Sequence, residues 1–187
     1  MISELSKKIS VYLIENGADH EEKEVLTYGA ECFLNLLISD GLLLVIGLLT
    51  HHGVPLLIWA VSFSLLRANL GGLHALSHFW CILIGTVIGA SSIIVSPVLA
   101  AHPVATVLCT IVGAIIAIVI APVPHKNKEY IQARRKKIKV KVAVTAVIEC
   151  ILTCVFYFAN PIYAAYIACG LIMAVVLGIA GSIWNPR

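Results

Sequence analysis

The segment RANLGGLHALSHFWC, residues 67–81, interrupts the apolar sequence that fills most of the chain. It begins with a charge at Arg67, contains the pair Gly71-Gly72, and separates an apolar run at 54–66 from another at 79–99. Glycine reaches backbone conformations that other residues avoid, so this pair can end one helix and redirect the chain into the next. We therefore expect apolar helices on either side, joined by short polar breaks.

The composition makes lipid the expected solvent for these helices. Of 187 residues, 60% are hydrophobic and 12% are charged, and the mean hydropathy is +0.98. A soluble chain of this length cannot bury so much apolar surface. The sequence predicts a single all-α integral membrane domain over residues 1–187, embedded in the lipid bilayer. The small net charge of +3 gives no indication of nucleic-acid binding.

Six apolar runs are candidates for membrane spans. A helix needs roughly 20 residues to cross the hydrocarbon core, and five of the runs reach or approach that length. The run at 54–66 is shorter and could be a tilted or re-entrant segment instead of a full crossing. We predict about six transmembrane helices, in the runs at about 33–50, 54–66, 79–99, 104–121, 142–159 and 162–184.

The N-terminal region predicts a helix on the membrane surface. Within residues 1–16, apolar side chains recur at three- and four-residue spacing, which is typical of an amphipathic interfacial helix. Asn16-Gly17 should end this helix, and Asp19 with Glu22 three residues later resembles a capping box that starts the next one.

Charge placement predicts the topology. All thirteen Lys and Arg residues lie in the N-terminal region, at Arg67, between Lys126 and Lys141, or at Arg187. Six crossings from a cytoplasmic N-terminus put every one of them inside, as the positive-inside rule requires. Residues 122–141 are then a basic cytoplasmic loop, both termini are cytoplasmic, and residues 67–81 face the same side.

Two acids fall within apolar runs, Asp40 and Glu149. Ionisable groups at membrane depth are costly and often functional. Glu149 is the better candidate for a buried polar partner, of an imidazole or of Arg67, in a structural or a catalytic supporting role. A small membrane transporter or a metal-binding membrane protein that uses Asp40, Glu149 and the histidines is the alternative class of function.

His74 and Cys81 are the residue types of a cysteine nucleophile and its general base. On one straight helix, seven residues would separate them by roughly 10.5 Å along the axis, whereas a base must come within roughly 3 Å of the proton that it removes. Gly71-Gly72 can supply the necessary break, and Ser77 can cap a new helix. Cys81 would then lie in the first turns, where the helix dipole favours the thiolate and free N–H groups can stabilise an oxyanion.

Spacing alone leaves other interpretations open. His78 lies three residues before Cys81 and could itself be the base. His74, His78 and Cys81 could together bind zinc, although the motif contains no carboxylate base and no HExxH pattern. The segment could also be an interfacial polar loop with Trp80 at the headgroup level.

Two motifs in this order are specific enough to compare with known families. The first is Arg67-x-x-x-Gly71-Gly72-x-His74-Ala75-x-Ser77-x-x-x-Cys81, and the second is Ala121-Pro122-Val123-Pro124-His125-Lys126-Asn127-Lys128. They resemble the accessory gene regulator B (AgrB) family of integral-membrane cysteine peptidases in Gram-positive quorum sensing. The opening Glu21-Glu22-Lys23-Glu24 with Tyr28-Gly29 is also similar. Glu129 departs from the family, which often has proline there, and this bears on loop shape and substrate docking.

The resemblance implies a function and assigns residues to it. It makes His74 and Cys81 the catalytic pair of an endopeptidase at the cytoplasmic face of the cell membrane, without metal or cofactor. The substrate would be an AgrD-like propeptide, cut through an acyl-thioester on Cys81 and cyclised to a thiolactone or lactone. The resemblance also implies a homodimer. Supporting or oxyanion candidates are Arg67, Gly71, Gly72, Ser77, His78 and Glu149.

The basic run has two interpretations. It can be a topology determinant that touches anionic lipid, or it can dock an acidic recognition tail of the propeptide. The docking candidates are Lys126, Lys128, Arg134, Arg135, Lys136 and Lys137.

Overall fold

The computed structural model describes residues 2–72, 77–123 and 132–184, and these residues are helical almost throughout, without a strand. A short 3₁₀ helix, η1, at His20–Glu22 precedes α2. The α-helices are α1 (Ile2–Glu15), α2 (Lys23–Leu49), α3 (Gly53–Leu70), α4 (His78–Ala101), α5 (Pro103–Ile120), α6 (Gln132–Ala159) and α7 (Pro161–Trp184).

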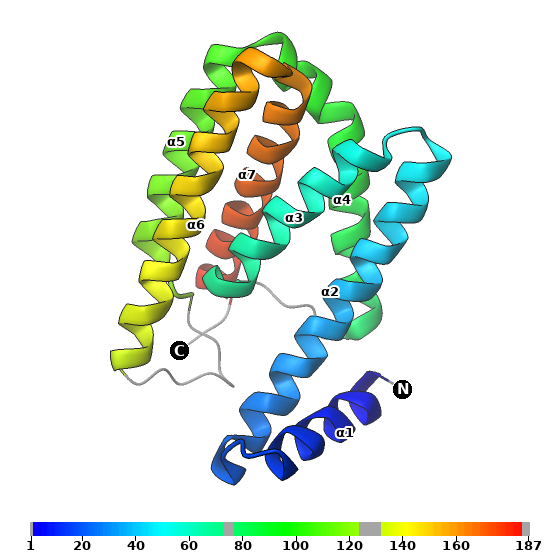
Figure 1. The fold of residues 1–187 in the computed structure, drawn as a ribbon, viewed down its shortest axis with the longest axis vertical. Helices are drawn as coiled ribbons and strands as arrows, with labels where there is room; N and C mark the ends of the chain where they lie inside the picture. Colours follow the sequence, from blue (N-terminus) through cyan, green and yellow to red (C-terminus); the bar gives the residue numbers. More distant parts are fainter. Residues whose placement is uncertain (1, 73–76, 124–131, 185–187) are drawn as a thin grey trace.

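Six of these helices, α2 to α7, are long and apolar enough to cross a membrane. The predicted all-α, six-span architecture with an additional N-terminal helix is therefore confirmed. The segment at 54–66, for which a tilted or re-entrant course was the alternative to a full crossing, belongs to one continuous helix of 18 residues, α3. Figure 1 shows that α3 runs obliquely past α7. Although α3 is shorter than α7, it packs along it as part of the bundle.

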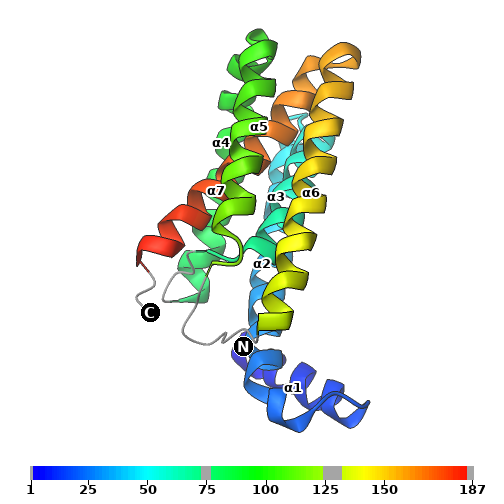
Figure 2. The ribbon, with the colours of Figure 1, turned by 90° about the vertical axis from the view of Figure 1, so that its left-hand side faces the viewer.

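The spans alternate in direction (Figures 1 and 2). The connections α2–α3, α4–α5 and α6–α7 lie at one end of the bundle, where His51 adopts a positive φ of 58°. Pro103 and Pro161 begin α5 and α7, because proline fits the first turn of a helix, where its missing N–H is not needed. At the opposite end lie α1, the ends of α3, α5 and α7, and the starts of α2, α4 and α6.

Helix α7 is the centre of the bundle and packs against α3, α4, α5 and α6. Its glycines allow a close approach to neighbouring helices. A Cβ atom on Gly170 would lie 2.9 Å from the carbonyl oxygen of Trp59, and one on Gly178 would lie 3.0 Å from Leu70 Cδ2. Both contacts are with α3, so α7 and α3 are held together along their length.

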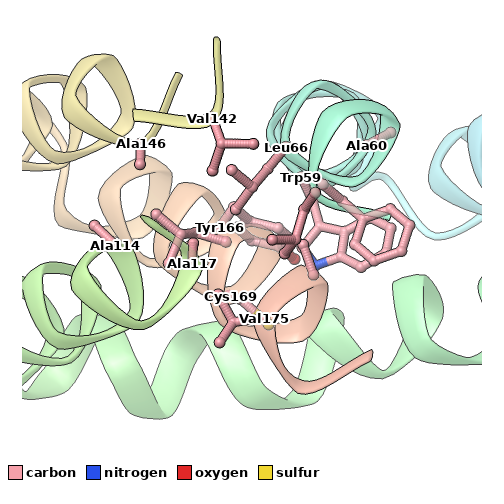
Figure 3. Close-up of a cluster of buried hydrophobic side chains, with 14 of the residues drawn as sticks. Trp59, Ala60, Leu66, Ala114, Ala117, Val142, Ala146, Tyr166, Cys169 and Val175 are labelled. Atoms are coloured by element: carbon pink, nitrogen blue, oxygen red, sulfur yellow. The ribbon is translucent and has the colours of Figure 1, made fainter. Parts of the chain in front are cut away.

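The buried core lies between α3, α5, α6 and α7 (Figure 3). Trp59 and Tyr166 are each fully buried, and the Trp59 ring stacks on Phe63 with the centroids 4.8 Å apart. Small residues such as Ala117 and Ala146 fill the positions where α5 and α6 come close to α7. Most large apolar side chains on α2, α4 and α5 are exposed, as expected for helices whose outer faces meet lipid.

The N-terminal helix forms as predicted but packs through its serines. Ser6 and Ser10 are buried, and Thr27 of α2 donates a hydrogen bond to Ser10 Oγ at 2.9 Å. Leu5 and Tyr12, part of the predicted apolar face, are 48% and 64% exposed. The small serines allow α1 to approach α2, which leaves the larger side chains pointing outward. Gly17, with φ of 102°, follows the end of α1 as predicted, and Asp19 caps η1 by accepting a hydrogen bond from the Glu21 N–H at 2.9 Å.

The predicted basic loop at 122–141 is partly wrong, because α6 begins at Gln132. Residues 135–141 therefore form the first turns of a long helix that continues into the span. Lysine and arginine are good helix formers, so the apolar part of α6 extends N-terminally through them. The basic side chains Arg135, Lys136 and Lys137 are exposed on this extension.

Candidate functional site

The candidate site lies where α3 ends and α4 begins, at the end of the bundle that also carries α1 (Figure 1). Ser77 caps α4: its backbone is extended, with φ of −134° and ψ of 152°, and its Oγ accepts a hydrogen bond from the Trp80 N–H at 3.4 Å. The Cys81 N–H donates to the Ser77 carbonyl at 3.1 Å. Cys81 therefore lies in the first turn of α4, and the prediction that Ser77 starts a new helix there is confirmed.

The two glycines end α3 by leaving the helical conformation. Gly71 has φ of 78° and Gly72 has φ of 133°, a region that favours glycine. The Val123 N–H donates to the Leu70 carbonyl at 2.9 Å, which ties this break to the segment after α5. The sequence motif around 67–81 and the motif that begins at Ala121 thus meet in space.

Arg67, in the last turn of α3, stabilises the break that follows this helix. Its Nη1 donates a hydrogen bond to the Gly71 carbonyl oxygen. A Cβ atom on Gly72 would lie 2.1 Å from that Nη1 and 2.7 Å from the Leu177 carbonyl oxygen. Only glycine leaves room here for the guanidinium between the loop and α7.

The same guanidinium interacts electrostatically with Cys81 of α4, and with Cys32 and Tyr28 of α2. Two neighbouring spans, α2 and α4, therefore bring polar groups to the cation that α3 carries. A positive charge beside a thiol favours its thiolate, which is the nucleophilic form. The Cys81 side chain is half-buried, so the thiol lies in a protected but reachable position. This arrangement suits covalent catalysis by a cysteine.

His78 is engaged with other helices. Its Nε2 lies 2.9 Å from Ser3 Oγ of α1, and its Nδ1 lies 3.1 Å from Nδ2 of Asn35 on α2. Glu31 Oε1 is 3.9 Å from the same Nε2. Both ring nitrogens thus have neighbours within hydrogen-bonding distance, which leaves His78 less suited than a free imidazole to remove a proton from Cys81.

Several predicted residues lie outside the described part of the chain. These are His74, Lys126 and Lys128, and the side chain of Arg134 is not described either. The pairing of His74 with Cys81 and the docking role of the basic residues therefore stay predictions. In the described ranges, no group of three or more His, Cys, Asp or Glu side chains is arranged to hold a metal ion.

The two intramembrane acids occupy different surroundings. Asp40 accepts a hydrogen bond from Ser64 Oγ at 3.0 Å, which joins α2 to α3. Glu149 of α6 is 3% exposed, and neither carboxyl oxygen has a hydrogen-bond partner among the described residues. Glu149 lies near Ser62 of α3. Ser62 is five residues before Arg67, so these two positions are about 7.5 Å apart along the axis of α3.

Sequence reasoning missed the contribution of α2 to this site. Tyr28 and Cys32 approach Arg67, while Glu31 and Asn35 approach His78. Residues 28, 31, 32 and 35 follow the three- and four-residue spacing of one helix face. That spacing was visible in the sequence, but nothing in it indicated that this face meets α3 and α4.

Comparison with known proteins identifies the family. The family model described as accessory gene regulator B matches residues 6–178. An AgrB-like protein of Clostridium perfringens strain SM101 (type A) is 32% identical over 145 residues, which cover 73% of this chain and 68% of the relative. A second AgrB-like protein, from Clostridium perfringens strain 13 (type A), is 30% identical over the same shares. No solved structure matches the chain. Because the family match begins in α1, reaches into α7 and includes both motifs that meet at Leu70 and Val123, the chain belongs to the accessory gene regulator B (AgrB) family.

Proposed function

We propose that this chain is a membrane-embedded cysteine endopeptidase that cuts an AgrD-like propeptide, with Cys81 as nucleophile and His74 as general base. Membership of the AgrB family implies a part in quorum-sensing peptide processing. The observation that carries the finer proposal is the position of Cys81, in the first turn of α4 and beside the Arg67 guanidinium. Both the helix dipole and the cation favour a thiolate at that position.

In the first step, His74 accepts the thiol proton and Cys81 Sγ attacks the scissile carbonyl carbon. The N–H groups at the start of α4, apart from those of Trp80 and Cys81 that donate to Ser77, can donate to the developing oxyanion. Collapse of the tetrahedral intermediate breaks the C–N bond, and His74 returns its proton to the leaving amine. An acyl-thioester then joins the N-terminal part of the peptide to Cys81.

In the second step, a thiol or hydroxyl of the bound peptide attacks the thioester carbonyl and closes the ring. Its proton returns through His74 to Cys81, so the enzyme is regenerated and no water is consumed. An internal nucleophile has the advantage of proximity over water, and a site at the membrane surface limits hydrolysis of the intermediate. Because a thioester is less stable than an amide, removal of the products must draw the cycle forward.

The substrate tail would dock on the N-terminal extension of α6. Arg135, Lys136 and Lys137 are exposed there, at the same end of the bundle as the start of α4 (Figure 1). Their charge favours an acidic peptide as well as anionic lipid. The positive-inside rule assigns this end to the cytoplasm, where a newly made propeptide would arrive. The functional unit in this proposal is a homodimer in the cell membrane.

The test uses the full chain in lipid vesicles with a synthetic propeptide. Cys81→Ala and His74→Ala should each abolish cleavage while the protein remains folded. Cys109→Ala is the matched control, because Cys109 is an exposed thiol on α5 and should leave cleavage unchanged. Mass spectrometry should detect the N-terminal peptide fragment bound to Cys81, and a chelator should have no effect. Cleavage that survives in Cys81→Ala would exclude Cys81 as the nucleophile.

A further inference from the structure

One imidazole joins three helices at the start of α4, within one turn of the proposed nucleophile. His78 is the first residue of α4, three positions before Cys81. Its ring lies between Ser3 of α1 and Asn35 of α2, at 2.9 Å and 3.1 Å respectively. These partners are 75 and 43 residues away in the sequence, so the contacts depend entirely on tertiary structure.

The two hydrogen bonds of the His78 ring are coupled, because the donor at one ring nitrogen fixes the role of the other. Asn35 Nδ2 can only donate, so it donates to His78 Nδ1, and the neutral ring then carries its proton on Nε2 and donates it to Ser3 Oγ. The Glu31 carboxylate, 3.9 Å from Nε2, is favourably placed on the same side. If the amide of Asn35 is turned over, Nδ1 donates, Nε2 accepts from the Ser3 hydroxyl, and both bonds persist. The contacts of His78 with Ser3 and Asn35 therefore do not depend on the tautomer of the ring.

The packing of α1 explains why its first turn reaches α4. Thr27 of α2 donates to Ser10 Oγ near the far end of α1, and Ser6 is fully buried. Residues 3, 6 and 10 follow helical spacing on one face of α1. That face is therefore held along α2 from Ser10 to Ser3, and Ser3 is the point where α1 contacts the start of α4.

We propose that His78 is a positioning residue that holds the N-terminal helix α1 over the first turn of α4 and thereby limits access to Cys81. Helix α1 exposes Leu5, Val11 and Tyr12, so its outer face suits the membrane interface. A displacement of α1 by a substrate or by the lipid surface would be transmitted to α4 through the His78 ring. The role in peptide cleavage rests on the proposed function, whereas the effect on access to the thiol does not.

The experiment measures the rate at which iodoacetamide alkylates Cys81 in the full chain in vesicles, with site-resolved mass spectrometry and no propeptide. Ser3→Ala removes the α1 contact. His78→Asn can still reach Asn35 but is too short to reach Ser3. Since one hydrogen bond contributes a net 0.5–1.5 kcal/mol, each change should raise the alkylation rate about two- to tenfold. The double variant should be no faster than either single one, because the two residues share one bond.

Two further variants distinguish a positioning role of His78 from a general loss of packing between α2 and α4. His78→Gln places an amide donor near the position of Nε2 and should restore the wild-type alkylation rate. Ser39→Ala removes the 3.3 Å contact between Ser39 and Thr86 Oγ1, which joins α2 to α4 further along the same pair of helices. It should leave Cys81 alkylation unchanged.

The proposal fails if Ser3→Ala leaves the alkylation rate unchanged, if the Ser3 and His78 effects simply add, or if Ser39→Ala has an equal effect. The cleavage rate of the same variants is measured in parallel and should change in Ser3→Ala and His78→Asn but not in His78→Gln. Should Cys81→Ala still cleave propeptide, the proposed function fails, and the alkylation rates still decide whether His78 holds α1.

Discussion

Arg67 donates a hydrogen bond to the carbonyl oxygen of Gly71, four residues further along the chain, and so holds the end of α3 closed on itself. The same side chain interacts electrostatically with Cys81, Cys32 and Tyr28, which lie on the neighbouring spans α4 and α2. One guanidinium therefore connects the shape of the loop to the electrostatic environment of the thiol.

Arg67→Lys should lower propeptide cleavage at least about tenfold. Lysine keeps the charge but lacks the planar fork of donors, so it cannot bond Gly71 and face Cys81 together. The measurement is the initial cleavage rate in vesicles. Asn69→Ala is the control on the same turn, because the Asn69 side chain donates to the Leu65 carbonyl oxygen of its own helix. A wild-type rate in Arg67→Lys would show that charge alone suffices.

Gly72→Ala should both destabilise the protein and abolish cleavage. The added Cβ would lie 2.1 Å from Arg67 Nη1 and 2.7 Å from the Leu177 carbonyl oxygen, at φ of 133°. The strain should cost about 1–3 kcal/mol, which thermal unfolding in detergent can detect. Gly29→Ala is the matched control, since a Cβ there meets nothing within 4 Å. An unchanged melting temperature and cleavage rate in Gly72→Ala would contradict the close approach of Arg67.

Ser77→Ala should reduce cleavage and cost about 1 kcal/mol, because it removes the side-chain cap that starts α4. Ser77→Asp and Ser77→Asn should retain the cap and most of the activity. Unfolding and cleavage are measured together. Ser91→Ala serves as the comparison within α4, where Ser91 bonds to its own helix at Ile88. Equal losses in Ser77→Ala and Ser77→Asp would show that the cap is not what positions Cys81.

Glu149→Gln should leave cleavage unchanged and should not lower stability. The side chain is 3% exposed, and its oxygens have no hydrogen-bond partner among the described residues, so a neutral amide of the same shape avoids the cost of burying an ionised carboxylate. Glu149→Lys should unfold the protein, because it places an unpaired cation in the same position. If Glu149→Gln folds normally and loses cleavage, the carboxyl takes part in the reaction as a supporting group.

Reversing the charge of Arg135, Lys136 and Lys137 to glutamate should raise the KM for propeptide at low salt and leave kcat nearly unchanged. Repulsion of an acidic tail acts on binding and is screened by salt. Topology is checked in parallel with a reporter fused to the C-terminus. Reversing Lys7 and Lys8, exposed basic residues on α1, provides the comparison. Unchanged cleavage with intact topology would eliminate the docking role and leave lipid contact as the function of the run.

The sequence by itself determined the helices and their ends. Apolar runs predicted five spans by their length, and charge placement supported the short run at 54–66 as the sixth. Ser77 predicted the start of α4, because capping acts over a few neighbouring residues. It missed the extension of α6 back to Gln132, where helix propensity outweighs the expectation that a basic run is a loop. It gave no indication that the serine face of α1 packs on α2, since amphipathic spacing shows which face suits lipid and not which neighbour the opposite face meets.

Only the tertiary structure decided which side chains meet. The convergence of Arg67 with Cys81, Cys32 and Tyr28, and the contact of His78 with Ser3 and Asn35, join residues from separate helices. Local sequence sets the length and the capping of each helix, but its rotation about its own axis is set by packing. That rotation follows from the small residues of α1 and α7, and it decides which polar groups surround the thiol.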